Sequence, residues 1–158
     1  AGNIGSDYDN PESKYFLTHA HAFTKHRGFE LVGFVDTNHL KARSASVKWA
    51  TRYFLNLSEA FKEYPTIDVV CIAVPDSLHY EILKMVANYQ PKLVFAEKPL
   101  TETLEQGLEI QKLYFERNIP VLINFKRAFV PEILDIIGHA RQDEFGAFVS
   151  CFGLYNRG

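Results

Sequence analysis

The chain has 158 residues, of which 47% are hydrophobic and 23% charged, as expected of one globular domain with a real core. Its 17 basic and 19 acidic residues give a net charge of −2, so no basic excess points to nucleic acid or an anionic membrane. No apolar run approaches the roughly 18 residues that a membrane span needs. The two cysteines, Cys71 and Cys151, lie in apolar runs, which favours a reducing, cytoplasmic compartment over a disulfide framework.

The ends of the chain suggest an internal piece of a longer polypeptide. The chain begins Ala1-Gly2-Asn3-Ile4-Gly5, without an initiator Met, a basic segment or a signal-type apolar run. The run from Phe148 to Leu154 resembles a strand that is broken off shortly afterwards at Gly158. We therefore expect further chain on both sides.

Short apolar runs alternate with longer amphipathic stretches along the chain. The runs contain almost no polar alternation, as expected of strands covered on both faces. They are Phe29–Val35, Ile67–Val74, Lys92–Ala96 and Pro120–Asn124, with a weaker run at Arg52–Phe54. Helices are expected at Glu12–His26, His39–Ala50, Leu57–Tyr64, Ser77–Asn88, Glu102–Arg117 and Pro131–Ala140. This alternation predicts an α/β fold, a doubly wound Rossmann-type parallel sheet.

Local signals support several helices and one domain boundary. Asn56 followed by Glu59 is typical of a capping box, and Asp76 or Ser77 can cap the next helix. After the last helix, a new strand is expected at 147–154. It could extend the same sheet, but it also suits the first strand of a second domain. We assign residues 1–140 to the first domain and 141–158 to the start of a second.

The glycines of Gly2-Asn3-Ile4-Gly5 match the end of a G-x-G-x-x-G motif. In such a motif Gly2 lets the backbone approach a pyrophosphate, Gly5 allows close helix–strand packing, and a helix N-terminus holds the phosphates. Two glycines three residues apart also occur in ordinary turns.

Asp36 stands directly after the run Phe29–Val35, where the second strand of a dinucleotide fold ends. A carboxylate there accepts hydrogen bonds from an adenine-ribose diol and repels a 2′-phosphate. The usual glycine-to-acid spacing is ~20 residues. The spacing here is longer, and the segment Ser6–Leu17 has the character of an insertion that accounts for the excess. The alternative is a solvated turn aspartate.

Val74-Pro75 follows the most apolar run, at the carboxyl end where α/β proteins bind ligands. His79 is expected in the first turn of the next helix, facing the cleft. It is a candidate cofactor contact or catalytic acid or base, although a lone histidine is more often structural.

Glu97-Lys98-Pro99 is the most informative stretch, because it places two opposite charges at the end of an apolar strand. Lys98 could hydrogen-bond a substrate hydroxyl and stabilise developing alkoxide charge. Pro99 would fix the direction of that lysine. A cis peptide bond before Pro99 is one way in which it could do so.

Asn124 ends the next run and can orient an amide or hydroxyl of a cofactor or substrate. Lys126 and Arg127 follow it and can meet phosphate or carboxylate, with Arg127 the candidate substrate contact. A solvated basic turn explains the two cations equally well.

Several other chemistries are excluded. His19 and His21 lie two residues apart, hence on nearly opposite sides of a helix, and cannot share a metal there. Neither cysteine has a partner at zinc-like spacing, and no Gly-x-Ser-x-Gly or Walker-type motif is present. No metal site is expected.

Taken together, these motifs resemble the glucose–fructose oxidoreductase and inositol dehydrogenase family of nicotinamide-dependent sugar oxidoreductases. The matching pieces are Gly2-Asn3-Ile4-Gly5, Asp36, Val74-Pro75 with His79, Glu97-Lys98-Pro99, and Asn124 with Lys126-Arg127. They occur in the family's order, and Glu-Lys-Pro is the specific element.

The resemblance implies a dinucleotide domain followed by an α/β domain with an open sheet that binds substrate and often builds a homo-oligomer. Lys98 would match the family lysine that contacts both nicotinamide and the reacting hydroxyl. The remaining catalytic aspartate and histidine would lie beyond Gly158, and the first strand, central in the order 3-2-1-4-5-6, before Ala1. We therefore expect this stretch alone to be inactive and poorly folded.

The leading hypothesis is an oxidoreductase that uses NAD rather than NADP. It would transfer a hydride between nicotinamide and a hydroxyl-bearing carbon of a sugar, cyclitol or nucleotide-sugar. One alternative is a non-catalytic regulator that senses NAD or a sugar. Another is an NAD-dependent epimerase or glycosidase that works by transient oxidation.

Overall fold

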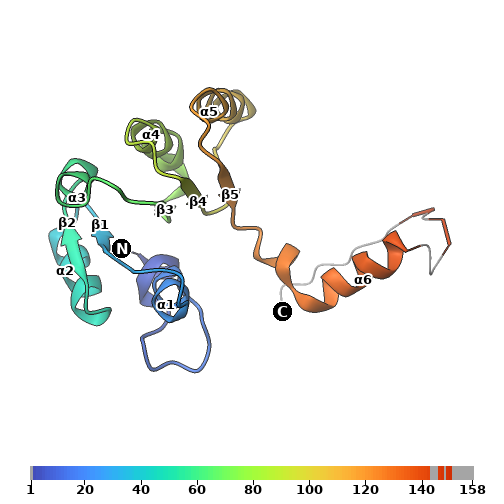
Figure 1. Ribbon diagram of the computed structural model, residues 1–158, viewed down its shortest axis with the longest axis horizontal. Helices are drawn as coiled ribbons and strands as arrows, with labels where there is room; N and C mark the ends of the chain where they lie inside the picture. Colours follow the sequence, from blue (N-terminus) through green and yellow to red (C-terminus); the bar gives the residue numbers. More distant parts are fainter. Residues whose placement is uncertain (1, 143–145, 148, 151–158) are drawn as a thin grey trace. The chain divides into compact units, whose positions relative to one another are not determined.

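The computed structural model describes residues 2–142, 146, 147, 149 and 150 (Figure 1). Contacts between residues divide the chain into two units, Ala1–Asn124 and Phe125–Gly158. All strands found in the described residues lie in the first unit. The predicted boundary near residue 140 stays a prediction.

The strands form where the sequence is richest in branched and aromatic residues. In the described part of the chain they are β1 (Gly33–Val35), β2 (Arg52–Phe54), β3 (Val69–Ile72), β4 (Leu93–Ala96) and β5 (Val121–Ile123). Each lies inside a predicted run, and the weak run is a strand. The longer runs extend beyond the hydrogen-bonded pairing, so their ends are loop.

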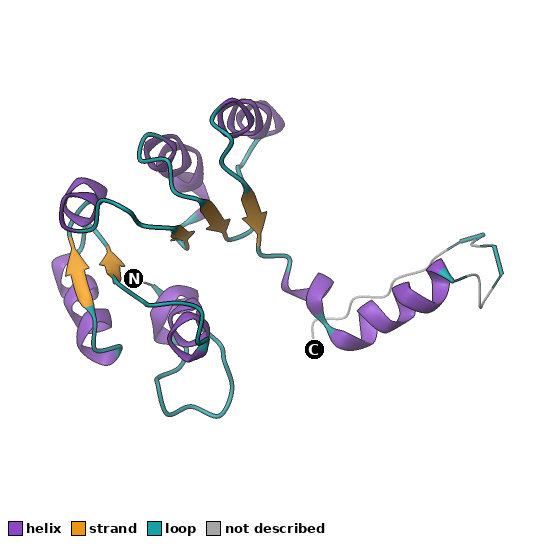
Figure 2. Ribbon diagram, in the orientation of Figure 1, coloured by secondary structure: helices purple, strands orange, loops and turns teal. Residues whose placement is uncertain are grey.

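The helices alternate with these strands, as Figure 2 shows. Those of the first unit are α1 (His19–Lys25), α2 (His39–Lys48), α3 (Leu57–Glu63), α4 (Asp76–Ala87) and α5 (Leu104–Glu116), with a short π-helical turn, η1 (Asn3–Asp7), before them. The predicted bounds of α2 to α5 agree to within two residues at each end. The prediction for Glu12–His26 is wrong over its first half, because α1 begins only at His19.

Two helix starts test the capping predictions. At α3 the capping box is present: Asn56 Oδ1 accepts from the Glu59 N–H at 2.9 Å, and the Glu59 carboxylate accepts from the Leu55 N–H at 2.9 Å. At α4 the prediction of an Asp76 or Ser77 cap is wrong. The helix begins at Asp76 itself, behind Pro75, and no side chain caps it.

All strand pairs are parallel. β1 pairs with β2, and β4 pairs with β3 on one side and β5 on the other. The two sheets thus have the orders β1-β2 and β3-β4-β5. In the doubly wound order 3-2-1-4-5-6, β2 and β1 match positions 3 and 2, and β3, β4 and β5 match positions 4, 5 and 6. β1 and β3 therefore flank position 1. The fold is the predicted Rossmann-type α/β fold.

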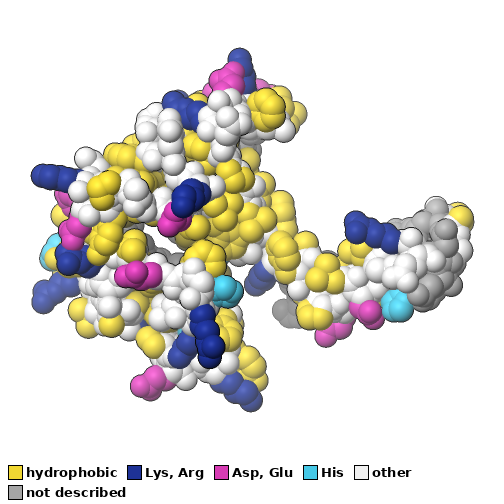
Figure 3. Space-filling view, viewed as in Figure 1, with side chains coloured by type: hydrophobic (Ala, Val, Ile, Leu, Met, Phe, Trp, Pro, Cys, Tyr) yellow, Lys and Arg dark blue, Asp and Glu magenta, His cyan; other side chains and the backbone are white. Residues whose placement is uncertain are grey.

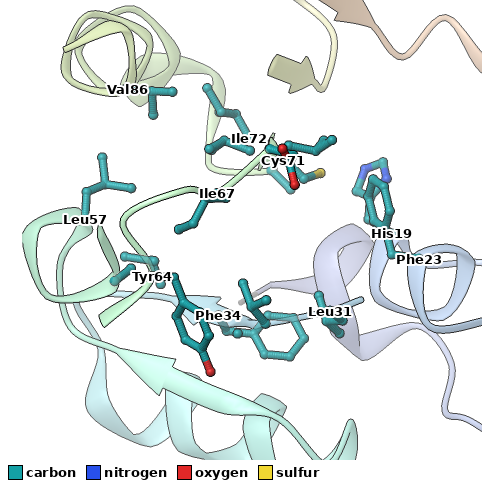
Figure 4. A pocket seen from close by; sticks show the side chains of 18 of the residues that line it. His19, Phe23, Leu31, Phe34, Leu57, Tyr64, Ile67, Cys71, Ile72 and Val86 are labelled. Carbon is teal, nitrogen blue, oxygen red and sulfur yellow. The ribbon is translucent and has the colours of Figure 1, made fainter. Parts of the chain in front are cut away.

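A cavity of about 790 Å³ lies between β1 and β3 (Figure 4). Its walls are apolar and come from both sheets and from the helices beside them, including Leu31, Phe34, Ile67 and Ile72. Within the described residues, β1 and β3 each pair with a strand on one side only. The cavity therefore lies where the doubly wound order 3-2-1-4-5-6 has its central strand.

Two buried clusters hold the sheets to their helices. Ile72, Val94, Leu83 and Ile110 join β3 and β4 to α4 and α5, which lie over these strands in Figure 1. A smaller cluster of Ala20, Phe34, Ala45 and Trp49 joins α1 and α2 to β1. Figure 3 shows charged side chains protruding from the surface, with hydrophobic side chains exposed between them.

The contact between β1 and β2 requires a glycine. A Cβ at Gly33 would lie 2.9 Å from a ring carbon of Phe54 and 3.0 Å from the carbonyl oxygen of Arg52. The first distance is shorter than real Cβ contacts, and the second is tighter than most of them. Gly33 thus lets β2 approach and so supports the end of β1, where Asp36 follows.

The second unit contains a 3₁₀ turn, η2 (Lys126–Phe129), and α6 (Pro131–Arg141). Pro131 occupies the first turn of α6, where its missing N–H costs nothing. The strand predicted at 147–154 lies largely outside the described residues. Among the described residues, no helix is long and apolar enough to cross a membrane.

Candidate dinucleotide site

The parallel register brings three predicted motifs to one edge of the sheet β3-β4-β5. The ladder continues one residue past the strands: the Glu97 N–H donates to the Ile72 carbonyl at 2.9 Å, and the Asn124 N–H donates to the Ala96 carbonyl at 2.8 Å. Val74-Pro75 follows β3 at the same edge. Parallel sheets bind ligands at this carboxyl edge.

The glycine segment lies beside the end of β3. A Cβ placed on Gly5 would lie 3.7 Å from the Ala73 Cβ, and one on Gly2 would lie 4.0 Å from the Ala73 carbonyl oxygen. The Ser6 N–H donates to the Gly2 carbonyl at 2.8 Å, which closes the turn of η1. The structure thus places Gly2-Asn3-Ile4-Gly5 next to Val74-Pro75, two motifs about 70 residues apart in the sequence.

Helix α2 fixes the far end of this turn. The Trp49 indole N–H and the Lys48 ammonium both donate to the Ser6 carbonyl, each at 3.1 Å. Lys48 also lies 3.3 Å from the Asp7 carboxylate. Two donors on one carbonyl make the position of the glycine segment independent of the loop that follows.

The predicted insertion, Ser6–Leu17, covers the end of η1 and nearly all of the following loop, residues 8–18. Asp9 holds the two ends of this loop together. The Asp9 carboxylate accepts from the backbone N–H groups of Leu17 and Thr18, from the Thr18 hydroxyl and from His21 Nδ1. The Thr18 hydroxyl in turn accepts from the His21 N–H and caps α1. The N-terminus of α1 is therefore closed by this chain's own side chains, so the expectation that this helix end holds phosphates is not supported.

These hydrogen bonds set the ionisation of Asp9. Burial alone would raise the pKa of its carboxyl, but the bonds from Thr18, Leu17 and His21 outweigh burial and hold the pKa below 3.8. Asp9 is 7% exposed and His21 fully buried. The cluster is a buried structural centre of the first unit, in which the Asp9 carboxylate accepts four hydrogen bonds and His21 Nε2 has no partner among the described residues.

Glu97 accepts two hydrogen bonds on one oxygen. His19 Nε2, from α1, lies 2.8 Å from Glu97 Oε1, and Asn124 Nδ2, from the end of β5, lies 2.7 Å from the same atom. Burial raises the pKa of Glu97, but the bonds from Asn124 and His19 outweigh it and lower the pKa below 4.5. Glu97 is therefore a fixed, ionised acceptor.

Lys98 follows directly and is exposed. The peptide bond between Lys98 and Pro99 is cis. The sequence analysis left the choice between a cis and a trans bond open. The carboxylate of the neighbouring Glu97 is engaged with His19 and Asn124.

Asp36 lies one residue past β1, as predicted. Its N–H donates to the Phe54 carbonyl at 3.1 Å, and its Oδ1 accepts from the Asn38 N–H at 2.8 Å. Asn38 caps α2. Asp36 thus stands between the sheet and the start of the next helix, a position from which its carboxylate can reach a ligand at the strand ends.

His79 lies in the first turn of α4, as predicted, but the expectation that it faces the cleft is wrong. Its side chain is fully buried, and Nε2 donates to the Val74 carbonyl at 3.1 Å. The adjacent apolar helix face favours burial of this ring over exposure. The hydrogen bond from His79 to the Val74 carbonyl therefore stabilises the turn Val74-Pro75.

Lys126 and Arg127 belong to η2 in the second unit, and both are exposed. Their predicted contact with a phosphate or carboxylate stays a prediction. Within the described residues, no group of three or more His, Cys, Asp or Glu side chains could hold a metal ion. Burial, followed by the negative charge of Glu97, raises the pKa of Cys71 to about 12, so its thiol is a poor nucleophile.

Sequence reasoning missed two residues that shape the site. The sequence analysis considers His19 only as a metal ligand and includes Asp9 only as part of the insertion. The contact between His19 and Glu97 joins residues 78 positions apart, and no local spacing signals it. The available local signal is that His19 directly follows Thr18, a residue type that often caps a helix.

The fold and this edge define a class of protein. A doubly wound parallel sheet with a glycine segment, an acid after β1 and polar groups after β4 and β5 is a dinucleotide-binding domain. The model of a family described as "Oxidoreductase family, NAD-binding Rossmann fold" (Gfo/Idh/MocA) matches residues 13–125. The chain belongs to this family. The match includes Asp36, Glu97, Lys98 and Asn124, and it begins after the glycine segment.

Known relatives agree with this assignment. An uncharacterised oxidoreductase of Synechocystis sp. is 30% identical over 113 residues, which cover 72% of this chain and 30% of the relative. The WlbA dehydrogenase from Bordetella pertussis, solved in complex with NADH and UDP-GlcNAcA, superposes with a TM-score of 0.73 at 25% identity, covering 81% of this chain and 37% of that one.

A second similar structure shows the fold alone. It is a putative NADPH-dependent oxidoreductase from Desulfitobacterium hafniense, with a TM-score of 0.75 at 18% identity, covering 80% of this chain and 36% of that one. The chain thus spans about a third of the length of these relatives.

Proposed function

We propose that the whole protein is an NAD-dependent oxidoreductase acting on a hydroxyl-bearing carbon of a sugar, cyclitol or nucleotide-sugar. The observation that carries this proposal is the exposed ammonium of Lys98, placed at the carboxyl edge beside the fixed pair of Glu97 and Asn124. The sugar-nucleotide complex of the WlbA dehydrogenase supports the substrate class.

The residues at the edge fit a dinucleotide. Gly2 and Gly5 lie beside Ala73, just before Val74-Pro75, and the backbone of Asn3 and Ile4 would contact the pyrophosphate there. Asp36 would accept hydrogen bonds from the adenine-ribose hydroxyls, and its charge would repel a 2′-phosphate, which favours NAD over NADP. Glu97 and Asn124 would orient the nicotinamide end. His79 would act on the cofactor only through the Val74 turn.

The cofactor, when bound, supplies hydride transfer. Lys98 then donates a hydrogen bond to the reacting oxygen of the substrate and stabilises the negative charge that develops on it. Because the Glu97 carboxylate already accepts from His19 and Asn124, it does not neutralise this ammonium. Arg127 would contact a polar group of the substrate. The resemblance places the proton acceptor, a histidine, in the second domain.

The test uses the complete gene product, with NAD or NADP and a panel of sugars, cyclitols and UDP-sugars. Lys98→Met is expected to lower kcat by on the order of a thousandfold, because one positioned charge is lost at the reacting oxygen. Lys92→Met is the matched control: Lys92 precedes β4 at its other end and pairs there with the exposed Asp68.

The outcomes separate the enzyme from a sensor. A substrate whose turnover depends on Lys98 and not on Lys92 supports the proposal. Tight binding of NAD with no turnover anywhere in the panel contradicts it and favours a non-catalytic regulator. A homo-oligomer built through the second domain is part of the same proposal and is measured by light scattering.

A further inference from the structure

Helix α1 carries two buried histidines that the proposed function leaves unused. His21 belongs to the Asp9 cluster, and His19 reaches across to Glu97. The loop of residues 8–18, most of which belongs to the predicted insertion, ends at Thr18, the cap of this helix. Hydrogen bonds of the two histidines thus connect Asp9, through the first turn of α1, to Glu97, the residue before Lys98.

The first link is the rigid start of α1. Asp9 accepts from Leu17, Thr18 and His21, so it holds both the end of the insertion and the first turn of the helix. His21 packs against Phe16 and Trp49, with ring centroids 4.5 and 5.5 Å apart. The backbone at His19 therefore has little room to move.

The second link is the His19 ring. It meets Phe95 of β4 edge-on, with ring centroids 5.1 Å apart, and its side chain is 11% exposed. Packing against Phe95 directs Nε2 at Glu97 Oε1, 2.8 Å away. Asn124 reaches the same oxygen from β5, so donors from two elements fix one carboxylate.

We propose that His19 is a positioning residue: by holding Glu97 together with Asn124, it keeps the Glu97 carboxylate away from Lys98 and leaves the Lys98 ammonium available to the substrate. The insertion serves this role through Asp9, which fixes the start of α1. This inference rests on the proposed function, because it assigns Lys98 the contact with the reacting oxygen.

Electrostatics give the reason. Glu97 is partly desolvated, so its charge needs donors, and the cation nearest in sequence is Lys98. The other titratable group beside it is Cys71 of β3, whose thiol stays neutral. With His19 present, Oε1 of the carboxylate accepts from α1 and from Asn124, and the Lys98 backbone also hydrogen-bonds the carboxylate. Without it, the carboxylate loses a donor, and an ion pair with Lys98 becomes the alternative.

The experiment compares three variants of the complete gene product. His19→Phe keeps a ring against Phe95 but removes the donor, and His19→Gln places an amide N–H near the position of Nε2. His26→Ala is the control, since it removes an exposed imidazole from the end of the same helix. Steady-state kinetics and the Kd for NAD are measured for each.

We expect His19→Phe to lower kcat roughly 10- to 100-fold with little change in the Kd for NAD. His19→Gln should restore most of kcat, and His26→Ala should leave it unchanged. Equal kcat for His19→Phe and the parent overturns the proposal. So does an equal loss in both His19 variants, which would mark a role in packing alone.

A second measurement does not depend on turnover. Titration of the Glu97 carboxyl by ¹³C NMR is expected to show a higher pKa in His19→Phe and a restored pKa in His19→Gln. If no substrate is turned over, the proposed function fails, and this titration still decides whether His19 holds Glu97. An unchanged Glu97 pKa in His19→Phe overturns the positioning role whether or not the enzyme is active.

Discussion

Asp9 Oδ2 lies 2.8 Å from His21 Nδ1, and solvent reaches almost none of either side chain. The pair stands at the base of an 11-residue loop, residues 8–18, that separates the glycine segment from α1. An insertion at this point of a dinucleotide fold would ordinarily loosen the helix that follows. Here one carboxylate supplies the acceptor that four donors need.

Replacing that carboxylate is expected to destabilise the protein. Asp9→Ala leaves buried donors of Thr18 and His21 without an acceptor, at about 1–3 kcal/mol for each unsatisfied group. We expect the free energy of unfolding of the complete protein to fall by at least about 2 kcal/mol. Urea unfolding measures it. Asp7→Ala is the control, because the exposed pair with Lys48 contributes about 0–1 kcal/mol. Equal losses in the two variants would contradict the role of Asp9.

The same carboxylates predict how stability depends on pH. The pKa values of Asp9 and Glu97 in the folded protein lie below 3.8 and 4.5, so the folded state binds fewer protons than the unfolded state at acid pH. Their stabilisation is therefore full above these values and is lost as the pH falls through the folded pKa.

Thermal melts of the complete protein between roughly pH 7 and pH 3 test this, since carboxylates titrate across that range. The Tm should fall more steeply on acidification in the parent than in an Asp9→Asn or Glu97→Gln variant. A parent Tm that rises toward acid pH would refute the assignment of both carboxylates.

Asp36 is expected to set the preference between the two nicotinamide cofactors. Asp36→Ser removes the charge that repels a 2′-phosphate, so the ratio of Kd values for NADP and NAD should fall by on the order of tenfold or more. Fluorescence titration with both cofactors measures the ratio. Asp68→Ser is the matched control, because Asp68 precedes β3 at the opposite end from the ligand edge. An unchanged ratio in Asp36→Ser would remove Asp36 from this role.

The sequence predicted those parts of the protein that depend on local pattern. The strand runs, the Asn56–Glu59 box, and the placement of Asp36 and Lys98 after strands follow from neighbours in the chain, and the structure bears them out. Parallel pairing then forces Glu97 and Asn124 to one edge. Such features need no knowledge of distant contacts.

What sequence reasoning missed depends on contacts across the fold. The buried face of α5 is one such feature, and the sequence analysis made no prediction of it. Leu104, Leu108 and Phe115 have helical spacing and are exposed, whereas Ile110 and Tyr114 are buried in the core. Periodicity identifies a helix without choosing its buried face when several faces are apolar. The burial of His79 and the late start of α1 likewise depend on partners outside their own segments.

The cavity between β1 and β3 leads to a last prediction, about folding. Two facing strand edges that pair on one side only leave their other backbone groups without a ladder, and the apolar cavity wall includes Phe34 and Ile72. A strand parallel to β3 that ends at Gly2 would pair with both edges and fill the cavity, since Gly2 lies beside Ala73 at the end of β3.

We therefore expect residues 1–158 produced alone to melt without a cooperative transition. The backbone amides of β1 and β3 should also exchange hydrogen far faster than they do in the complete protein. β4, paired on both sides, is the internal reference for exchange. A sharp thermal transition of the isolated stretch, with β1 and β3 as protected as β4, would show that these edges need no further strand.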